Sequence, residues 1–565
     1  MTRWTLKPQA DQAISTRLQK EINVSKPIAD LLVQRGIHNF EEAKAFFRPQ
    51  IEQLHDPFLM KDMDKAVLRI EQALEKGERI MVYGDYDVDG TTSVALMSSY
   101  LKNIYPDIVS YIPDRYDEGY GISYKGIDFA SDNGISLIIA LDCGIKAIDK
   151  INYAKEQSID FIICDHHLPG AEIPDALAVL DPKRNDCNYP YKELCGCGVG
   201  FKLIQGLQQS KSAPFEELFP YLDLVATAIA ADIVPIDGEN RILTYYGLKR
   251  INTQPRIGLK ALINLANKKK DLTVTDVVFT IAPRINAAGR MKHGLHAVEI
   301  LTETDEDMAT NFAKSIENYN TDRKATDKKI TEEALDQIQQ ANEEDRYTTV
   351  VYQENWHKGV IGIVASRLTE TYYRPTVVFT KSGDKLAASV RSVTGFDVYG
   401  ALEACSDTIE QFGGHKYAAG LTLKEENYLK FKEKFELVVR KQIDPKLLQA
   451  EILIDREIQL SQITSKFHAV LKQFSPFGPS NRSPIFMTKD IADTGYAKKV
   501  GADQTHLKCT FSNGEQAFGA IGFNLGSKVN LIKEQQPVKA VYAIEENEWN
   551  GNVSIQMRIK DIETL

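Results

Sequence analysis

The feature that most constrains the fold is a series of short apolar runs, spaced by about one helix, between residues 79 and 181. Each run is followed by polar residues and then by a helical pattern. Continuous apolar runs rich in β-branched residues are typical of strands buried on both faces of a parallel sheet. The runs comprise residues 80–83, 108–112, 137–141, 161–164 and 177–180. We therefore expect a doubly wound α/β domain that binds its ligands beyond the carboxyl ends of these strands.

The rest of the chain is expected to form further domains, because 565 residues exceed the size at which a single core stops growing. Residues 305–342 lack proline and glycine, and their apolar residues recur at helical spacing. A second α/β pattern follows, and after Pro445 the pattern alternates as in a small β-barrel. The predicted divisions are an N-terminal helical segment packed on the first α/β domain (1–75), that domain (76–304), a connecting helix (305–342), a smaller α/β domain (343–445) and a barrel (446–565).

The composition indicates a reducing compartment. Seven cysteines are an odd number and cannot form a complete disulfide framework, so we expect a cytoplasmic protein. Cys195 and Cys197 lack the spacer and the second pair of a zinc site, which favours structural thiols. The N-terminus has no apolar leader, and no stretch approaches the roughly 20 apolar residues that span a bilayer, so we expect no membrane association. A net charge of −10 argues against a globally basic nucleic-acid coat but is compatible with a local basic groove.

Three aspartates, Asp85, Asp87 and Asp89, alternate directly after the first run. Carboxylates crowded at one strand end are costly unless a cation lies among them. The alternatives are a solvated turn and a calcium loop of the EF-hand kind. Such a loop needs a glutamate at its twelfth position, where this chain has Leu96. We therefore interpret the motif as part of a metal site.

Acidic and histidine residues also follow the third and fourth runs, as Asp142 and as Asp165-His166-His167. Mixed carboxylate and imidazole ligands suit manganese or magnesium with open water positions. Asp232 ends another apolar stretch, where an aspartate could instead cap a helix. Two such cations could activate a water molecule and stabilise both oxygens of an in-line phosphoryl displacement. The sequence alone leaves open whether one ion binds or two.

These motifs resemble the DHH phosphoesterase superfamily, and within it the bacterial exonucleases specific for single-stranded DNA. The resembling segments follow the family's order over nearly the whole chain, at residues 84–90, 112–121, 231–235, 283–290, 356–367, 389–392 and 413–415. The resemblance implies a catalytic DHH domain, a substrate-binding DHHA1 domain and an OB-fold barrel for nucleic acid, with two divalent cations, Mn²⁺ or Mg²⁺. It implies that the metal ligands are Asp87, Asp89, Asp142, His166 and Asp232, that Asp142 bridges the ions, and that Asp85, Asp165 and His167 support them.

The resemblance also implies how substrate is held. The implied substrate-binding residues are Arg115, Asn286, Arg290, Ser389, Arg391 and His415. Ser389 and Arg391 would bind the 5′ phosphate together with Arg115, because a guanidinium fork pairs two phosphate oxygens at once. For each arginine alone, the alternative is a surface ion pair. A narrow slot between the two α/β domains would exclude duplex, and the barrel would accept unpaired bases.

The implied function is a single-strand-specific 5′→3′ exonuclease of DNA repair and recombination that releases nucleoside 5′-monophosphates. It would act as a monomer, with a single-strand-binding protein and a helicase as implied partners. Two alternatives remain, a phosphodiesterase for short oligoribonucleotides or cyclic dinucleotides, and a non-catalytic nucleic-acid-binding scaffold. The small-substrate relatives generally lack the N-terminal segment and the barrel, both of which this chain has. The intact ligand set favours an enzyme over a scaffold.

Overall fold

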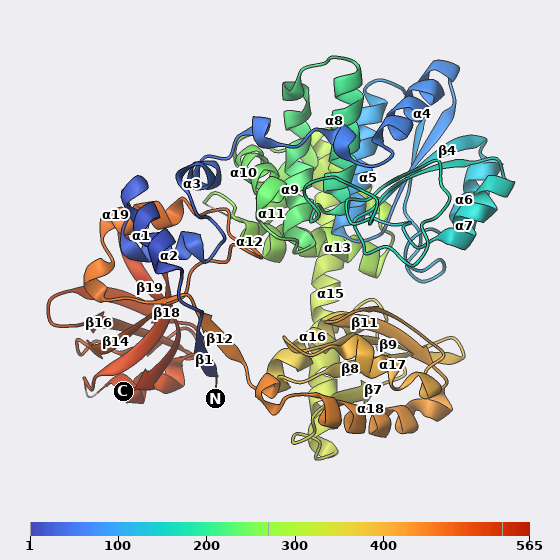
Figure 1. The fold of residues 1–565 in the computed structure, drawn as a ribbon. Helices are drawn as coiled ribbons and strands as arrows, with labels where there is room; N and C mark the ends of the chain where they lie inside the picture. Colours follow the sequence, from blue (N-terminus) through green and yellow to red (C-terminus); the bar gives the residue numbers. More distant parts are fainter. Residues whose placement is uncertain (1, 269, 534) are drawn as a thin grey trace.

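The computed structural model describes residues 2–268, 270–533 and 535–565. Two α/β domains lie one above the other along a single long helix, and a β-barrel lies beside them (Figure 1). Among the described residues, no helix combines the length and the apolar character needed to cross a bilayer. This arrangement confirms the expected fold class of two α/β domains and a barrel.

The first domain contains a five-stranded parallel sheet with the strand order β3-β2-β4-β5-β6. Its strands are β2 (Arg79–Gly84), β3 (Ile108–Tyr111), β4 (Ile135–Leu141), β5 (Asp160–Cys164) and β6 (Ala178–Leu180). These are the predicted apolar runs. One face is covered by α4 (Met63–Lys76), α5 (Val88–Lys102), α8 (Gly196–Ser210) and α9 (Leu222–Ala231). The other face is covered by α6 (Tyr124–Asp132) and α7 (Ile148–Glu156), which explains the continuous apolar character of the strands.

The connecting helix α15 (Glu306–Gln340) confirms the predicted helix. Its buried residues recur every three or four positions, so that a single stripe faces both domains in turn. Ala313 and Ile316 belong to the core of the first domain, whereas Ile330, Ala334 and Ile338 belong to that of the second. The helices before it are α10 (Gly238–Thr253), α11 (Ile257–Leu265), α12 (Val274–Asp276), the π-helix η4 (Val277–Ile281), α13 (Ala282–Met291) and α14 (Leu295–Thr302).

The second domain has a five-stranded sheet in the order β10-β11-β9-β8-β7, in which only β7 and β8 run parallel. The strands are β7 (Thr349–Tyr352), β8 (Thr376–Ser382), β9 (Lys385–Arg391), β10 (Gln411–His415) and β11 (Ala418–Leu423). The sheet packs on α16 (Ile361–Tyr372) on one face, and on α17 (Val398–Glu403) and α18 (Tyr428–Gln442) on the other. The ribbon β10–β11 is at one edge and lies below the first domain in Figure 1.

The C-terminal sheet has seven strands, and the additional pairing of β14 with β16 closes it into a barrel. The elements are β13 (Arg456–Glu457), α19 (Ser465–Lys472), β14 (Phe486–Asp493), β15 (Lys498–Val500), β16 (His506–Ser512), β17 (Ala517–Gly522), α20 (Val529–Ile532), β18 (Val538–Trp549) and β19 (Asn552–Thr564). Its interior is apolar, as the alternating pattern predicted.

The N-terminal segment differs from the prediction. We expected residues 1–75 to pack on the first α/β domain, but α1 (Gln12–Glu21), α2 (Lys26–Val33) and Ala43 of α3 (Phe40–Phe47) share the core of the barrel. In addition, β1 (Arg3–Leu6) pairs in parallel with β12 (Glu451–Ile454) at the entry to the barrel. The later part, including α4, packs on the first domain. The amphipathic pattern predicts that a helix has a buried face, but it does not indicate which domain packs against that face.

Candidate active site

The strand register brings the acidic motifs to one edge. Gly84 at the end of β2 pairs with Leu141 of β4, which in turn pairs with Cys164 of β5. The residues that directly follow these three are Asp85, Asp142 and Asp165. Parallel strands that end at the same level therefore place the three carboxylates side by side, as the sequence predicted.

The first turn of α5 adds two more carboxylates. Asp87 is the N-cap of α5, and its side chain accepts a hydrogen bond of 3.0 Å from the Gly90 N–H. Asp89 is buried and accepts hydrogen bonds from the Gly196 and Cys197 N–H groups, at 2.6 and 2.8 Å. A Cβ at Gly196 would lie 2.5 Å from the Cβ of Asp142, so a glycine is needed where the start of α8 meets the acidic motifs.

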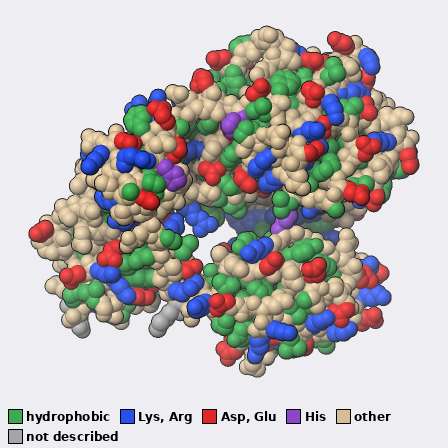
Figure 2. Space-filling view, viewed as in Figure 1, with side chains coloured by type: hydrophobic (Ala, Val, Ile, Leu, Met, Phe, Trp, Pro, Cys, Tyr) green, Lys and Arg blue, Asp and Glu red, His purple; other side chains and the backbone are tan. Residues whose placement is uncertain are grey.

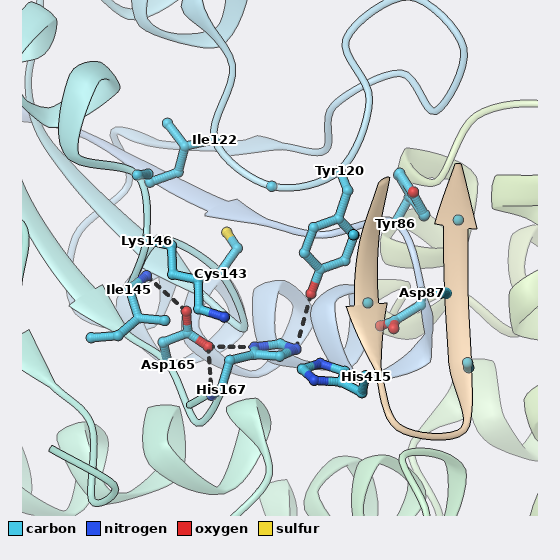
Figure 3. A pocket seen from close by; sticks show the side chains of 18 of the residues that line it. Tyr86, Asp87, Tyr120, Ile122, Cys143, Ile145, Lys146, Asp165, His167 and His415 are labelled. Carbon is cyan, nitrogen blue, oxygen red and sulfur yellow. Dashed lines mark hydrogen bonds and ion pairs between the residues drawn. The ribbon is translucent and has the colours of Figure 1, made fainter. Parts of the chain in front are cut away.

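Three carboxylates surround one imidazole. His166 Nε2 lies 3.2 Å from Asp142 Oδ1, 3.6 Å from Asp232 Oδ2 and 3.8 Å from Asp89 Oδ2. Asp232 follows α9 as its C-cap, so it comes from an element remote from the strands. The structure thus brings four of the five predicted ligands together, and the fifth, Asp87, lines the adjoining pocket (Figure 3).

The electrostatics of this cluster favour a cation. Burial and then the neighbouring carboxylates raise the pKa values of Asp142 and Asp232 well above the usual range, and they raise the pKa of Asp89 to about 6. Burial lowers the pKa of His166 to about 3, which keeps the imidazole neutral and able to act as a ligand. Within the described chain, the buried Asp142 Oδ1 has no hydrogen-bond partner. Crowded carboxylates and an unpartnered buried oxygen fit a divalent cation.

Asp165 and His167 form a separate pair beside the cluster. Asp165 accepts hydrogen bonds from the Ile145 and His166 N–H groups, at 2.9 and 2.8 Å, and lies 2.7 Å from His167 Nδ1. Burial raises the pKa of Asp165, but the hydrogen bond and charge of His167 outweigh it and hold the pKa at about 2. His167 Nε2 lies 3.2 Å from the hydroxyl of Tyr120 (Figure 3). Both Asp165 oxygens are thus occupied by protein donors, which suits an orienting role.

Asp85 is predicted to support the metal ligands and not to be one of them. Its Oδ1 accepts a long hydrogen bond of 3.4 Å from the Gly121 N–H, and Oδ2 has no partner among the described residues. Burial and the charge of Asp87 raise its pKa well above the usual range. The charged form of Asp85 is therefore disfavoured unless a cation lies nearby.

A cavity of about 830 Å³ separates the two α/β domains. The first domain contributes Asp87, Tyr120 and His167 to its lining, and the second contributes Arg391 and His415. The rings of His167 and His415 stack across it at 6.3 Å. Figure 2 shows the hollow between the two lobes, with basic and histidine side chains along it. The site therefore lies at a domain boundary, where ligand pockets are common.

Of the predicted substrate residues, Arg391 and His415 of the second domain line the cavity, whereas Arg115, Asn286 and Arg290 belong to the first domain. The Arg115 guanidinium stacks 3.9 Å from the Tyr86 ring centre, and Arg391 Nη1 donates a 3.0 Å hydrogen bond to Ser389 Oγ. Burial and then the charges of Arg115 and Arg391 lower the pKa of Arg290 to about 9. Such crowding of guanidinium groups is costly unless an anion lies among them. Asn286 is half-buried on α13, one turn before Arg290.

Tyr120 and Gly196 are absent from the predicted set, although the structure gives both a place in the site. Tyr120 lies in segment 112–121, and its ring lies 6.1 Å from those of both Tyr86 and His167. Gly196 lies between Cys195 and Cys197, which we considered only as a possible pair of zinc ligands or as structural thiols. The signal that could have found it is the glycine, because the N–H groups of Gly196 and Cys197 donate to Asp89.

Three family models match the chain. They are the DHH family N-terminal domain at residues 79–229, the DHHA1 domain at 345–441 and the RecJ OB domain at 454–561. The single-stranded-DNA-specific exonuclease RecJ of Bacillus subtilis is 36% identical, over 99% of this chain and 70% of that protein. RecJ of Salmonella typhimurium is 34% identical, over 89% of this chain and 90% of that protein. The chain belongs to the RecJ family.

A solved structure supports the same RecJ fold. RecJ from Thermus thermophilus in complex with Mn²⁺ matches with a TM-score of 0.86 and 26% identity, covering 100% of this chain and 80% of that one. The complex of the same protein with Mg²⁺ matches with a TM-score of 0.78 and 25% identity, covering 100% of this chain and 78% of that one. Membership of the RecJ family confirms the resemblance found in the sequence motifs and the assignment of the protein as a hydrolase.

Proposed function

We propose that this protein is a metal-dependent exonuclease that hydrolyses single-stranded DNA from the 5′ end and releases nucleoside 5′-monophosphates. The observation that supports this most directly is a cavity lined by Asp87 and Arg391, with the acidic cluster around His166 beside it and Arg290 close to Arg391. A phosphodiester needs both, because its charge must be neutralised and its phosphorus polarised. The curated relatives are named as single-stranded-DNA-specific exonucleases.

The acidic cluster would hold two divalent cations, Mn²⁺ or Mg²⁺. Asp87, Asp89, Asp142, His166 and Asp232 would be the ligands, with Asp142 between the two ions. When bound, such ions supply a nucleophile at neutral pH and stabilise the charge that develops on the phosphate. The N–H groups of Gly196 and Cys197 hold Asp89 in place, and the unpartnered Asp142 Oδ1 is available for coordination.

The remaining residues would bind and orient the strand. Arg115 and Arg391, with Ser389, would bind the terminal 5′ phosphate, and Arg290, Asn286 and His415 would contact the phosphate that is cleaved. Asp165 fixes His167 through Nδ1, so that Nε2 faces Tyr120 and the cavity. Because Arg391 and Ser389 of the second domain would hold the 5′ phosphate across the cavity from the ligands of the first, cleavage would fall one nucleotide from the end.

The slot between the domains and the barrel would supply strand specificity. The two domains approach closely where the rings of His167 and His415 stack at 6.3 Å, and a narrow slot of this kind would exclude a duplex. The barrel matches a family model for the RecJ OB domain, and OB-folds bind unpaired bases on exposed aromatic rings. We place the reaction in DNA repair and recombination, by a monomer working with a single-strand-binding protein and a helicase.

The experiment that tests the proposal compares substrates. The protein, freed of metal and then supplied with Mn²⁺ or Mg²⁺, is incubated with a labelled long single strand, the matching duplex and a dinucleotide. We expect mononucleotides from the single strand, little product from the duplex and no product with a chelator. A preference for the dinucleotide would instead assign the protein to the small-substrate phosphodiesterases of the superfamily. No hydrolysis of any substrate would support a binding scaffold.

A further inference from the structure

Besides α15, a tight contact joins the two domains beside the cavity. The turn before α16 places Gly359 against the first domain, where its carbonyl accepts a 2.9 Å hydrogen bond from Arg290 Nη1. The Tyr116 hydroxyl donates a 2.5 Å hydrogen bond to the carbonyl of Arg290. The rings of Tyr116 and His357 meet edge to face at 6.1 Å. We call the contact of Tyr116, Arg290 and Gly359 the glycine junction.

The glycine junction has no room for a side chain. A Cβ built on Gly359 would lie 2.6 Å from Tyr116 Oη and 2.7 Å from the Arg290 carbonyl oxygen. It would also lie 3.1 Å from His357 Cε1, within the same turn. Carbon and oxygen atoms that are not bonded do not approach so closely, so any larger residue must move the turn away from the first domain.

The junction is connected to the phosphate-binding residues on both sides. In the first domain, Tyr116 directly follows Arg115, and Arg290 is itself a predicted substrate residue. In the second domain, Gly362 at the start of α16 packs against the residues that face the 5′ phosphate. A Cβ there would lie 2.9 Å from Ser389 Oγ and 3.1 Å from Arg391 Nη2. A shift of the turn would therefore move these side chains with it.

We infer that Gly359 is a positioning residue that sets the distance between the phosphate-binding residues of the second domain, Ser389 and Arg391, and the acidic cluster of the first domain. The inference rests on the proposed function, because it assumes that one strand contacts both groups at once. A nucleotide that is held at its 5′ phosphate presents the next phosphodiester at a fixed distance. A displacement of about 1 Å between the two groups can cost about a hundredfold in rate even though every catalytic group remains.

The test is Gly359→Ala, with Gly400→Ala as the matched control. Gly400 lies in α17 of the same domain, and a Cβ there would meet nothing closer than Asp397 Cγ at 3.8 Å. We expect Gly359→Ala to lower kcat on a 5′-phosphorylated single strand by about tenfold to a hundredfold. We also expect the preference for a 5′ phosphate over a 5′ hydroxyl to fall toward one, whereas Gly400→Ala keeps both values. A loss of activity with an unchanged preference would indicate a general defect and would overturn the inference.

A second variant distinguishes a steric clash from misfolding. Tyr116→Phe removes the oxygen nearest to the added methyl group, so Gly359→Ala in that background should recover about threefold or more in kcat. Independent effects would multiply, and a double variant no better than that product would contradict the inference. The proposed function is judged separately on the unmodified protein. If that protein cleaves single strands but Gly359→Ala behaves like it, only the positioning role is wrong.

Discussion

The acidic cluster and the arginine cluster beside the cavity are opposite in charge and are carried by different structural elements. The acidic cluster is built from the ends of parallel strands and two helix termini, and its carboxylates are buried so that the pKa values of several are raised. The arginine cluster joins Arg391, on the antiparallel strand β9 of the second domain, to Arg115 and Arg290 of the first, and burial lowers the pKa of Arg290. Each cluster is therefore electrostatically unfavourable alone and is relieved by a ligand of the opposite sign.

The difference indicates a division of labour. In the proposed function, the buried carboxylate cluster would be stabilised by cations and would act on the scissile phosphate, whereas the half-buried arginine cluster would be stabilised by the substrate's own phosphates. Changes in the first cluster should alter the chemical step, and changes in the second should alter substrate binding. The following experiments test this division.

The largest effect is expected from Asp142→Ala. Because Asp142 lies 3.2 Å from His166 in the acidic cluster and has an unpartnered buried oxygen, its removal should lower the rate at saturating substrate by about a thousandfold. Hydrolysis of a 5′-labelled single strand in Mn²⁺ measures this. Asp132→Ala is the control, because that exposed aspartate ends α6 at the opposite end of β4. Retention of full activity by Asp142→Ala would show that the acidic cluster does not take part in the hydrolysis.

The second effect is metal-dependent stability. At a free Mn²⁺ concentration about a hundred times Kd, the folded protein should gain about 2.7 kcal/mol, and its thermal unfolding midpoint should rise. Asp142→Ala should lose most of this gain, and Arg391→Ala should keep it. Differential scanning calorimetry with and without a chelator measures the difference. An equal loss in both variants would mean that the two clusters do not divide the roles.

Arg391→Ala should have a smaller effect, and mainly on binding. Loss of a charge-assisted hydrogen bond costs about 2 kcal/mol, or roughly a thirtyfold increase in KM, with kcat changed much less. The slope of log KM against log salt concentration should also become shallower, by the amount expected for the loss of about one phosphate contact. Lys381→Ala in β8 is the control, because Lys381 pairs with Glu354 on the surface. A fall in kcat at unchanged KM would argue against a binding role.

The smallest effect concerns the barrel, which should add affinity without affecting either cluster. The ring of Phe523 is half exposed, with the Arg558 guanidinium 5.4 Å from its centre and the His506 ring at 5.2 Å. Phe523→Ala should weaken the binding of long single strands by about 1 kcal/mol, or about fivefold, and leave tetranucleotides unaffected. Fluorescence anisotropy with strands of both lengths measures this. Leu429→Ala, at an exposed site on α18, should change neither.

Local patterns made much of the fold predictable. The strands of the first sheet and the polar helix before the second domain appear at almost the predicted residues. This is because strand and helix periodicity depend on residues that are close together in the sequence. The convergence of Asp85, Asp142 and Asp165 followed from parallel strands alone. The assignment of Asp232 and Arg391 to the same cavity came from the family resemblance.

Contacts between distant segments were not predictable in the same way. The pattern of α1 and α2 required a buried face but did not show that the partner is the barrel rather than the first domain. The pairing of β1 with β12 joins residues about 450 positions apart. The sequence of a short strand does not identify the strand with which it pairs.

The sequence by itself determined which side chains could hold cations and at which sheet edge they would meet, because both depend on residue type and strand order. Only the tertiary structure decided how closely the two domains approach, and that Gly359 touches Tyr116 and Arg290 without room for a methyl group. The physical reason is that an interdomain distance depends on packing between surfaces far apart in the chain, and such packing leaves no periodic signal in the sequence.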